Sequence, residues 1–199
     1  ICKQILEAKG IKIVSHIKSI GTIEDKSFLD EKITEGFINS YMSKELPLID
    51  ELKEEAMRKE ILLAKEELDS IGGTVECAVL GIEPGIGNPF FDSVESTLAH
   101  LMFSIPAVKG IEFGRGFELT QMRGSQANDS MYFSGEKVLT KTNNNGGILG
   151  GITNGMPVIF KVAIKPTSSI LKSQNTVNIN TGEETVLEVN GRHDPCIVQ

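Results

Sequence analysis

The sequence predicts an α+β fold in which antiparallel β-sheets are layered with α-helices. Strand-like and helix-like segments are interspersed, and several successive strand-like segments are joined by short, hairpin-type links. Such links favour antiparallel pairing over a doubly wound parallel sheet, which needs helical crossovers. The chain has 199 residues, of which 40% are hydrophobic, and this suits one domain over residues 1–199 with a real core.

The first half of the chain predicts two helices and one strand. Residues 1–9 read as a helix that stops at Gly10. Residues 11–20 are rich in β-branched side chains and predict a strand, with Ile11, Ile13 and Ser15 on one face. Residues 24–45 are polar and predict short helical pieces and loops. An amphipathic helix is expected from Pro47 to Leu68, with these apolar residues near helical spacing: Leu52, Ala56, Ile61, Ala64 and Leu68.

The chain from Thr74 onward predicts further strands around one helix. The helix is expected to begin with a capping box formed by Asp92 and Glu95 and to run to Phe103, burying Val94, Leu98, Leu101 and Met102. The alternation in Thr74–Leu80 predicts a half-buried strand with Val75, Cys77 and Val79 on the same face. The remaining expected strands are Val108–Phe113, Val158–Ile164 and a pair made of Thr176–Ile179 and Thr185–Val189.

Charge and cysteine content narrow the function. A net charge of −7 argues against nucleic acid or an anionic membrane as partner, although a local basic pocket is still compatible with an anionic substrate. The three cysteines lack metal-ligand spacing and predict reduced thiols in a cytoplasmic protein. No apolar run has the length of a membrane span. Because the chain opens at Ile1 within a predicted helix and stops in an apolar run, we expect both ends to be cut.

Three stretches are candidates for ligand binding. Residues 146–155 hold five glycines, four of them in the first six positions and the fifth at Gly155, a density that fits either close backbone approach to a ligand or tight packing. Lys165-Pro166-Thr167-Ser168-Ser169 follows a predicted strand and offers one cation, hydroxyls and amide groups, as a phosphate cradle or a polar turn would. Arg192, His193 and Asp194 are adjacent and fit either an anion clamp with proton-moving groups or a structural loop.

Two other histidines carry weaker signals. His100 lies on the predicted helix among apolar neighbours and is expected to be a core or interface residue. His16 lies in a predicted strand and has no partner visible in the sequence.

Taken together, these stretches resemble the chorismate synthase family over almost the whole chain. The matching phrases occur in the family's order: Gly72-Gly73, Gly85–Pro89 with Phe91-Asp92, Ala99-His100, Ser104–Gly110, Arg123-Gly124-Ser125, Gly146–Ile148, Gly150–Ile152, Asn154-Gly155, Lys165–Ser169 and Gly191–Cys196. The ordered set is far more specific than any one motif.

The resemblance implies an enzyme, a carbon–oxygen lyase of the cytoplasm. Family members convert 5-enolpyruvylshikimate-3-phosphate to chorismate and phosphate by anti-1,4-elimination, the last step of the shikimate pathway. They need reduced FMN and form homotetramers. The family is also associated with NADP, because the flavin is reduced either by a separate reductase or by an intrinsic activity.

The resemblance also implies which residues lie at the site. The FMN-binding residues carried over are Pro106, Ala107, Gly150, Lys165, Pro166, Thr167, Ser168, Ser169 and Arg192, and Asp194 matches the acidic residue that assists proton transfer. No metal is expected.

The sequence departs from the family pattern in several places. The family's Gly-Glu-Ser-His-Gly motif, a second functional histidine, several substrate-binding arginines and the C-terminal helix are absent from these 199 residues, and Asn144-Asn145 replaces a His-Ala pair. Two alternatives therefore stand beside the lyase: a catalytically inactive flavin- or phosphate-binding module, and a fragment that only oligomerises.

Overall fold

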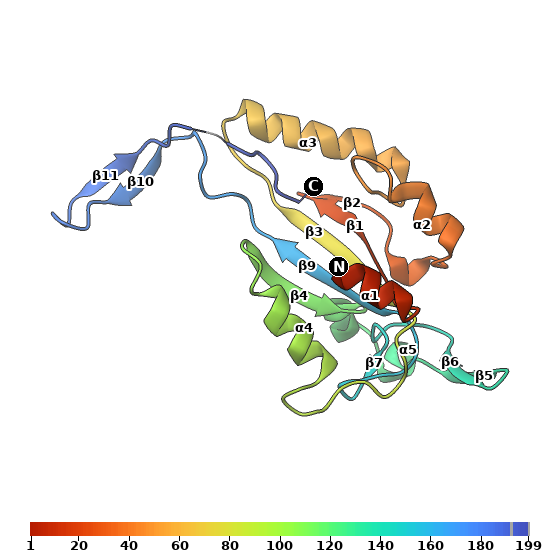
Figure 1. Cartoon of the computed structure of the whole chain (residues 1–199). Helices are drawn as coiled ribbons and strands as arrows, with labels where there is room; N and C mark the ends of the chain where they lie inside the picture. Colours follow the sequence, from red (N-terminus) through yellow and green to blue (C-terminus); the bar gives the residue numbers. More distant parts are fainter. Residues whose placement is uncertain (192, 199) are drawn as a thin grey trace.

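The computed structural model describes residues 1–191 and 193–198 and has a five-stranded antiparallel sheet at its centre (Figure 1). The strand order is β2-β1-β3-β9-β4. The strands are β1 (Lys12–Ile20), β2 (Ile23–Glu24), β3 (Gly73–Leu80), β4 (Val108–Phe113) and β9 (Val158–Ile164). All pairings in this sheet are antiparallel, which confirms the predicted fold class.

Helices cover both faces of this sheet. They are α1 (Cys2–Ala8), α2 (Glu35–Tyr41), α3 (Glu54–Glu66), α4 (Val94–Met102) and α5 (Gly124–Ala127), with 3-10 turns η1 (Phe28–Asp30), η2 (Glu51–Lys53) and η3 (Gly116–Gln121). Ala78 of β3 packs with the α2 side chains, whereas its neighbours Cys77 and Val79 pack with those of α4. Since successive strand residues point to opposite faces, α2 and α4 lie on opposite sides of the sheet.

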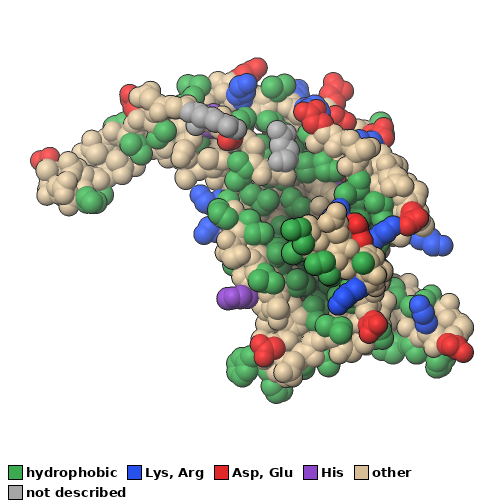
Figure 2. Space-filling model, in the orientation of Figure 1, with side chains coloured by type: hydrophobic (Ala, Val, Ile, Leu, Met, Phe, Trp, Pro, Cys, Tyr) green, Lys and Arg blue, Asp and Glu red, His purple; other side chains and the backbone are tan. Residues whose placement is uncertain are grey.

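The helix α3 lies on the same side as α4. Its buried Met57 contacts Ile17 and Ile20 of β1, in a cluster that also includes Cys196 near the C-terminus. Figure 2 shows hydrophobic side chains gathered between α3 and α4 on the face in view. No helix in the described ranges is long and apolar enough to cross a membrane.

Three two-stranded hairpins complete the fold. They are β5 (Met131–Ser134) with β6 (Lys137–Thr140), β7 (Ile148–Leu149) with β8 (Ile152–Thr153), and β10 (Gln174–Val177) with β11 (Glu184–Leu187). The predicted C-terminal pair is confirmed, because Thr176 lies opposite Thr185, although both strands begin and end earlier than predicted. The β5–β6 and β10–β11 hairpins project from opposite ends of the molecule (Figure 1).

The predicted starts of two helices were wrong. The helix expected from Pro47 begins at Glu54, because Asp50 accepts a hydrogen bond from the Leu52 backbone N–H and caps the 3-10 turn η2 first. Leu52 is consequently 88% exposed, and Met57 and Ala64 form the buried stripe. The cap of α4 is Ser93, whose hydroxyl accepts from the Ser96 backbone N–H, and not the predicted Asp92.

Strand boundaries were predicted better than strand faces. β4 and β9 have the predicted ends, and Val75, Cys77 and Val79 of β3 are half-buried as expected. However, the opposite face of the sheet is the more deeply buried one, because Glu76 and His16 are 0% and 1% exposed. His100 is exposed on α4, so it is not a core residue of this chain, and the alternative that it lies at an interface stays a prediction.

Candidate functional site

The predicted phosphate cradle, residues 165–169, directly follows β9 and lies beside Ala107. The Lys165 backbone N–H donates to the Ala107 carbonyl oxygen at 2.9 Å. Ala107 has φ +69°, a conformation that costs a non-glycine residue about 1–2 kcal/mol. The fold therefore places Ala107, with the exposed Pro106 before it, against the start of the cradle.

Two polar groups of the cradle have no partner in the part of the chain that the structure describes. The Lys165 ammonium group has no ion-pair partner among the described residues. The Thr167 Oγ1 atom is buried and has no hydrogen-bond partner in the described ranges. A buried polar atom without a partner is costly, so both groups fit an anionic ligand that supplies acceptors. Pro166, Ser168 and Ser169 are exposed.

Residues 68–72 fasten the cradle to the sheet. The Ser70 hydroxyl donates to the Thr167 carbonyl oxygen at 2.6 Å, and the Leu171 and Lys172 backbone N–H groups donate to the Leu68 carbonyl oxygen. A Cβ at Gly72 would lie 2.4 Å from the Ile164 carbonyl oxygen, so only glycine permits this close approach.

The described part of the C-terminal motif, residues 193–195, lies beside the cradle and residues 68–72. His193 Nδ1 lies 3.2 Å from the Ser169 carbonyl oxygen, and the Ile71 backbone N–H donates to the Pro195 carbonyl oxygen at 2.8 Å. Asp194, between them, is exposed. The predicted clamp Arg192 lies outside the described residues. Thus Ala107, residues 165–169 and Asp194 come together, although up to 87 residues separate them in the chain (107 to 194).

Gly150 lies elsewhere in this structure. It forms the exposed turn between β7 and β8, and the next residue, Gly151, accepts a hydrogen bond from Val94 at the N-terminal end of α4. Pro106 and Ala107 follow the C-terminal end of that helix. Nine helical residues span about 13 Å, so Gly150 is separated from the cradle by the length of α4.

The glycines in residues 146–155 differ in what surrounds them, so some fit tight packing and others fit close backbone approach to a ligand. A Cβ at Gly146, Gly147 or Gly151 would lie within 2.4–2.8 Å of other chain atoms, so these three glycines serve tight packing. A Cβ at Gly150 would meet nothing within 4 Å, so Gly150 has open space in front of it. Of these four glycines, Gly150 alone keeps the geometry of a ligand-approach residue.

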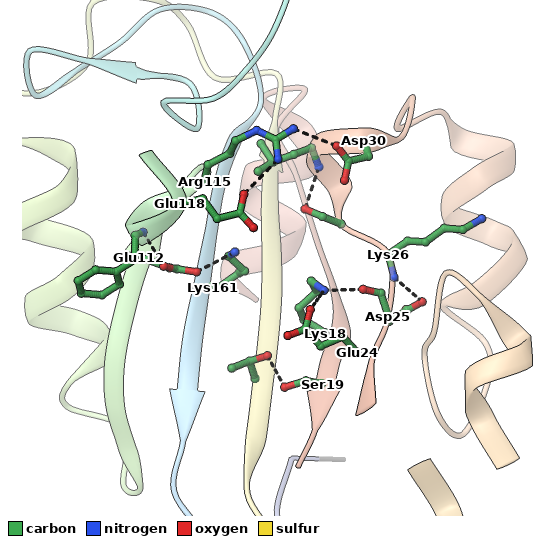
Figure 3. A pocket seen from close by; sticks show the side chains of 14 residues that line it. Lys18, Ser19, Glu24, Asp25, Lys26, Asp30, Glu112, Arg115, Glu118 and Lys161 are labelled. Carbon is green, nitrogen blue, oxygen red and sulfur yellow. Dashed lines mark hydrogen bonds and ion pairs between the residues drawn. The ribbon is translucent and has the colours of Figure 1, made fainter. Parts of the chain in front are cut away.

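A second concave region lies on the face of the sheet that carries α2 (Figure 3). This cleft of about 440 Å³ is lined by Lys18, Ser19, Glu24, Asp25, Lys26, Ser27, Leu29, Asp30, Thr74, Glu112, Arg115, Phe117, Glu118 and Lys161. Its strongest charges are paired: Lys161 with Glu112 at 2.7 Å, and Arg115 with both Asp30 and Glu118. Because most of its charge is already neutralised, the cleft is a poorer anion site than the cradle.

A row of charged side chains crosses the sheet beneath this cleft. The strand register places His16 opposite Glu76, Glu76 opposite Lys161, and Lys161 opposite Glu112. The signs alternate along the row when His16 is protonated, so each residue has an oppositely charged neighbour. The row is buried at His16 and open to solvent at Glu112.

His16 is the buried residue that the sequence could not interpret. Its Nδ1 lies 3.1 Å from Asp25 and its Nε2 lies 2.9 Å from Glu76, and all three side chains are 0% exposed. Burial opposes the charged form, but the hydrogen bonds with both carboxylates outweigh it and raise the pKa of His16 above 6.5. The same contacts hold the pKa values of Asp25 and Glu76 below their usual range despite burial. No local sequence pattern indicated this cluster, because only the strand register brings Glu76 to His16.

No group of His, Cys, Asp and Glu side chains in the described part of the chain has the arrangement of a metal site.

Comparison with known proteins identifies the family. The chorismate synthase family profile matches residues 1–199. The chorismate synthase of Pyrococcus abyssi is 46% identical over 197 residues, which cover 98% of this chain and 53% of that protein. The chorismate synthase of Dehalococcoides mccartyi is 43% identical over 198 residues, covering 100% and 53%. The chain thus spans about half the length of the curated relatives it matches.

A solved structure agrees with the sequence comparison. The crystal structure of a chorismate synthase superimposes with a TM-score of 0.76 at 37% identity, covering 84% of this chain and 53% of the other. At 37% identity, the similarity indicates a common family as well as a common fold. The chain therefore belongs to the chorismate synthase family.

Proposed function

We propose that the protein is an FMN-dependent carbon–oxygen lyase that converts 5-enolpyruvylshikimate-3-phosphate to chorismate and phosphate by anti-1,4-elimination. This is the last step of the shikimate pathway. The observation that carries the proposal is the cradle after β9, in a chain that belongs to the chorismate synthase family. It combines the cation of Lys165 with the buried hydroxyl of Thr167, neither of which has a partner among residues 1–191 and 193–198.

The cradle fits the phosphate group of FMN. Lys165 supplies charge, Thr167 and Ser168 supply hydroxyl donors, and the backbone after β9 supplies amide groups. Arg192 is proposed as a bidentate clamp on the same group, and Pro166 and Ser169 complete the cradle. Pro106, Ala107 and Gly150 are proposed to lie against the rest of the cofactor, Gly150 through its open backbone.

The protein's own groups supply positioning and proton transfer. When bound, reduced FMN supplies an electron transiently to the substrate. Asp194 is proposed as the acid/base group, because the residue is exposed and its neighbours His193 and Pro195 hold it beside the cradle. Exposure near the cradle gives this carboxyl access to a bound ligand.

The remaining expectations follow from family membership. We propose that the complete protein works in the cytoplasm as a homotetramer, with the phosphorylated substrate as its small-molecule partner. Reduced flavin is proposed to come from an NADP-linked step.

Flavin affinity tests the cradle. The substitutions Lys165→Ala and Arg192→Ala are made in the full-length protein that contains these 199 residues. We expect each to weaken FMN binding about tenfold or more, because each removes a charged partner of the phosphate. Fluorescence quenching of FMN on titration with protein measures the affinity. A matched control is Lys109→Ala, which removes an exposed lysine of β4 and should leave binding unchanged. If a variant with both Lys165→Ala and Arg192→Ala keeps the wild-type affinity for FMN, the proposed FMN site is wrong.

A further inference from the structure

We propose that His193 is a positioning residue that fastens the segment carrying Asp194 to the phosphate cradle, so that it strengthens binding at the phosphate end of the flavin. The inference rests on the proposed function, and it assigns to His193 a role distinct from that of its neighbours.

The contacts of His193 join three segments of the chain. Its Nε2 lies 2.7 Å from the Asp69 carbonyl oxygen, and its Nδ1 lies 3.2 Å from the Ser169 carbonyl oxygen. Asp69 belongs to the loop before β3, and Ser169 ends the cradle. One half-buried imidazole ring therefore ties the C-terminal motif to both.

Both acceptors are carbonyl oxygens, which accept hydrogen bonds and donate none. A neutral imidazole donates through one nitrogen only, so the ring makes both bonds at once when both nitrogens carry protons. The Ser169 contact joins the ring to the end of the cradle, and the Asp69 contact joins it to the loop before β3, so the imidazole holds the Asp194 segment beside residues 165–169.

The charges around His193 are compatible with this role. The Asp69 carboxylate is held by Lys172 at 2.8 Å, and Glu67 lies 3.6 Å from the same ammonium group. Asp194 follows in sequence, and Lys165 opens the cradle that Ser169 closes.

Other contacts hold the C-terminal segment independently of His193. The Pro195 carbonyl oxygen accepts from Ile71, and Cys196 and Val198 are buried in the cluster that contains Met57. Loss of the imidazole should therefore leave the segment attached and the protein folded. What it removes is the link between this segment and the cradle.

Comparison of FMN with riboflavin tests the role, because the two ligands differ only by the phosphate group. Affinities are measured in the full-length context for the wild type and His193→Phe, which keeps a ring but has no donor. His100→Phe is the matched control, since His100 is exposed and makes no polar contact within the part of the chain that the structure describes. Thermal unfolding verifies that each variant is folded.

We expect His193→Phe to bind FMN about tenfold more weakly, the effect of one or two lost hydrogen bonds, and to bind riboflavin as the wild type does. His100→Phe should change neither affinity. Equal losses for both ligands would show a merely structural role and overturn the inference, as would an unchanged FMN affinity. A wild type that does not prefer FMN over riboflavin would contradict the proposed cradle itself, and that result is visible before any variant is made.

Discussion

The Nε2 atom of His16 lies 2.9 Å from a carboxylate oxygen of Glu76, although the two residues are 60 positions apart in the chain. The Asp25 carboxylate lies on the other side of the ring at 3.1 Å. These carboxylates also hold backbone elsewhere: Glu76 accepts from Phe28, and Asp25 accepts from Ile49 and Asp50. The cluster thus fixes the segment between β2 and α3 to the sheet.

The stability of the fold should depend on the protonation of His16. Its pKa is raised above 6.5 in the folded protein by the two carboxylates. A raised folded-state pKa contributes stability that is fully present below about 6.5 and is lost as the pH rises through the folded value. Urea unfolding at a series of pH values from 6 upward should therefore show a decreasing free energy of unfolding. In His16→Gln this part of the decrease should disappear, and an unchanged slope in the variant would contradict the assignment.

Removal of one carboxylate from the cluster should strongly destabilise the protein. Glu76→Ala leaves Ser27 and Phe28 without their acceptor and His16 without one of its two carboxylates. Breaking a buried pair of this kind costs about 3–5 kcal/mol. Urea unfolding measures the loss. Glu35→Ala is the matched control, because Glu35 makes a solvent-exposed ion pair with Lys12, and its removal should change stability little.

Asp129 should determine the conformation of the loop that leads into the glycine run. Its carboxylate accepts hydrogen bonds from the Thr142 hydroxyl, the Asn144 and Asn145 backbone N–H groups and the Asn145 side chain, at 2.7–3.0 Å. Asp129→Ala leaves these donors without a partner, so we expect a loss of about 1–3 kcal/mol and faster amide exchange at residues 142–147. Asp92→Ala, at an exposed position, is the control and should alter neither the stability nor the amide exchange. Unchanged amide exchange in Asp129→Ala would contradict the role of Asp129 in holding this loop.

Two adjacent glycines should tolerate alanine differently. Both Gly150 and Gly151 have positive φ, so each alanine carries the backbone cost of about 1–2 kcal/mol. A Cβ at Gly151 would also lie 2.8 Å from the Ser93 Cβ, whereas a Cβ at Gly150 meets nothing. Gly151→Ala should therefore be less stable than Gly150→Ala by about 1–3 kcal/mol, the cost of overpacking. Equal unfolding midpoints for the two variants would show that the glycine run is not packed as described.

Regular strands were the easiest features to predict from the sequence. β4 and β9 have the predicted ends, because runs of β-branched and apolar residues mark strands without reference to distant partners. The helix starts were missed, since a local cap decided each one: Asp50 before η2 and Ser93 before α4. Ser93 competed with its neighbour Asp92, which has a similar capping propensity, and Pro47 suggested a start ahead of the Asp50 cap.

The candidate site could be predicted only in part for a related reason. The cradle is continuous in sequence, so its residue types alone indicated an anion site. The proximity of Ala107 to Lys165, and of His193 to Ser169, depends on the strand order and on loops that no local pattern encodes. His16 carried no signal for the same reason, because its two partners come from other segments.

We propose that this chain carries part of a chorismate synthase site, with Asp194 as its acid/base group. The most direct test is the anaerobic formation of chorismate from 5-enolpyruvylshikimate-3-phosphate with reduced FMN. The full-length protein, its Asp194→Ala variant and the 199-residue chain are assayed side by side. We expect product from the full-length protein, a rate lower by about two to four orders of magnitude in Asp194→Ala with FMN still bound, and none from the 199-residue chain. Absence of product from the folded full-length protein would contradict the lyase and leave a flavin- or phosphate-binding module.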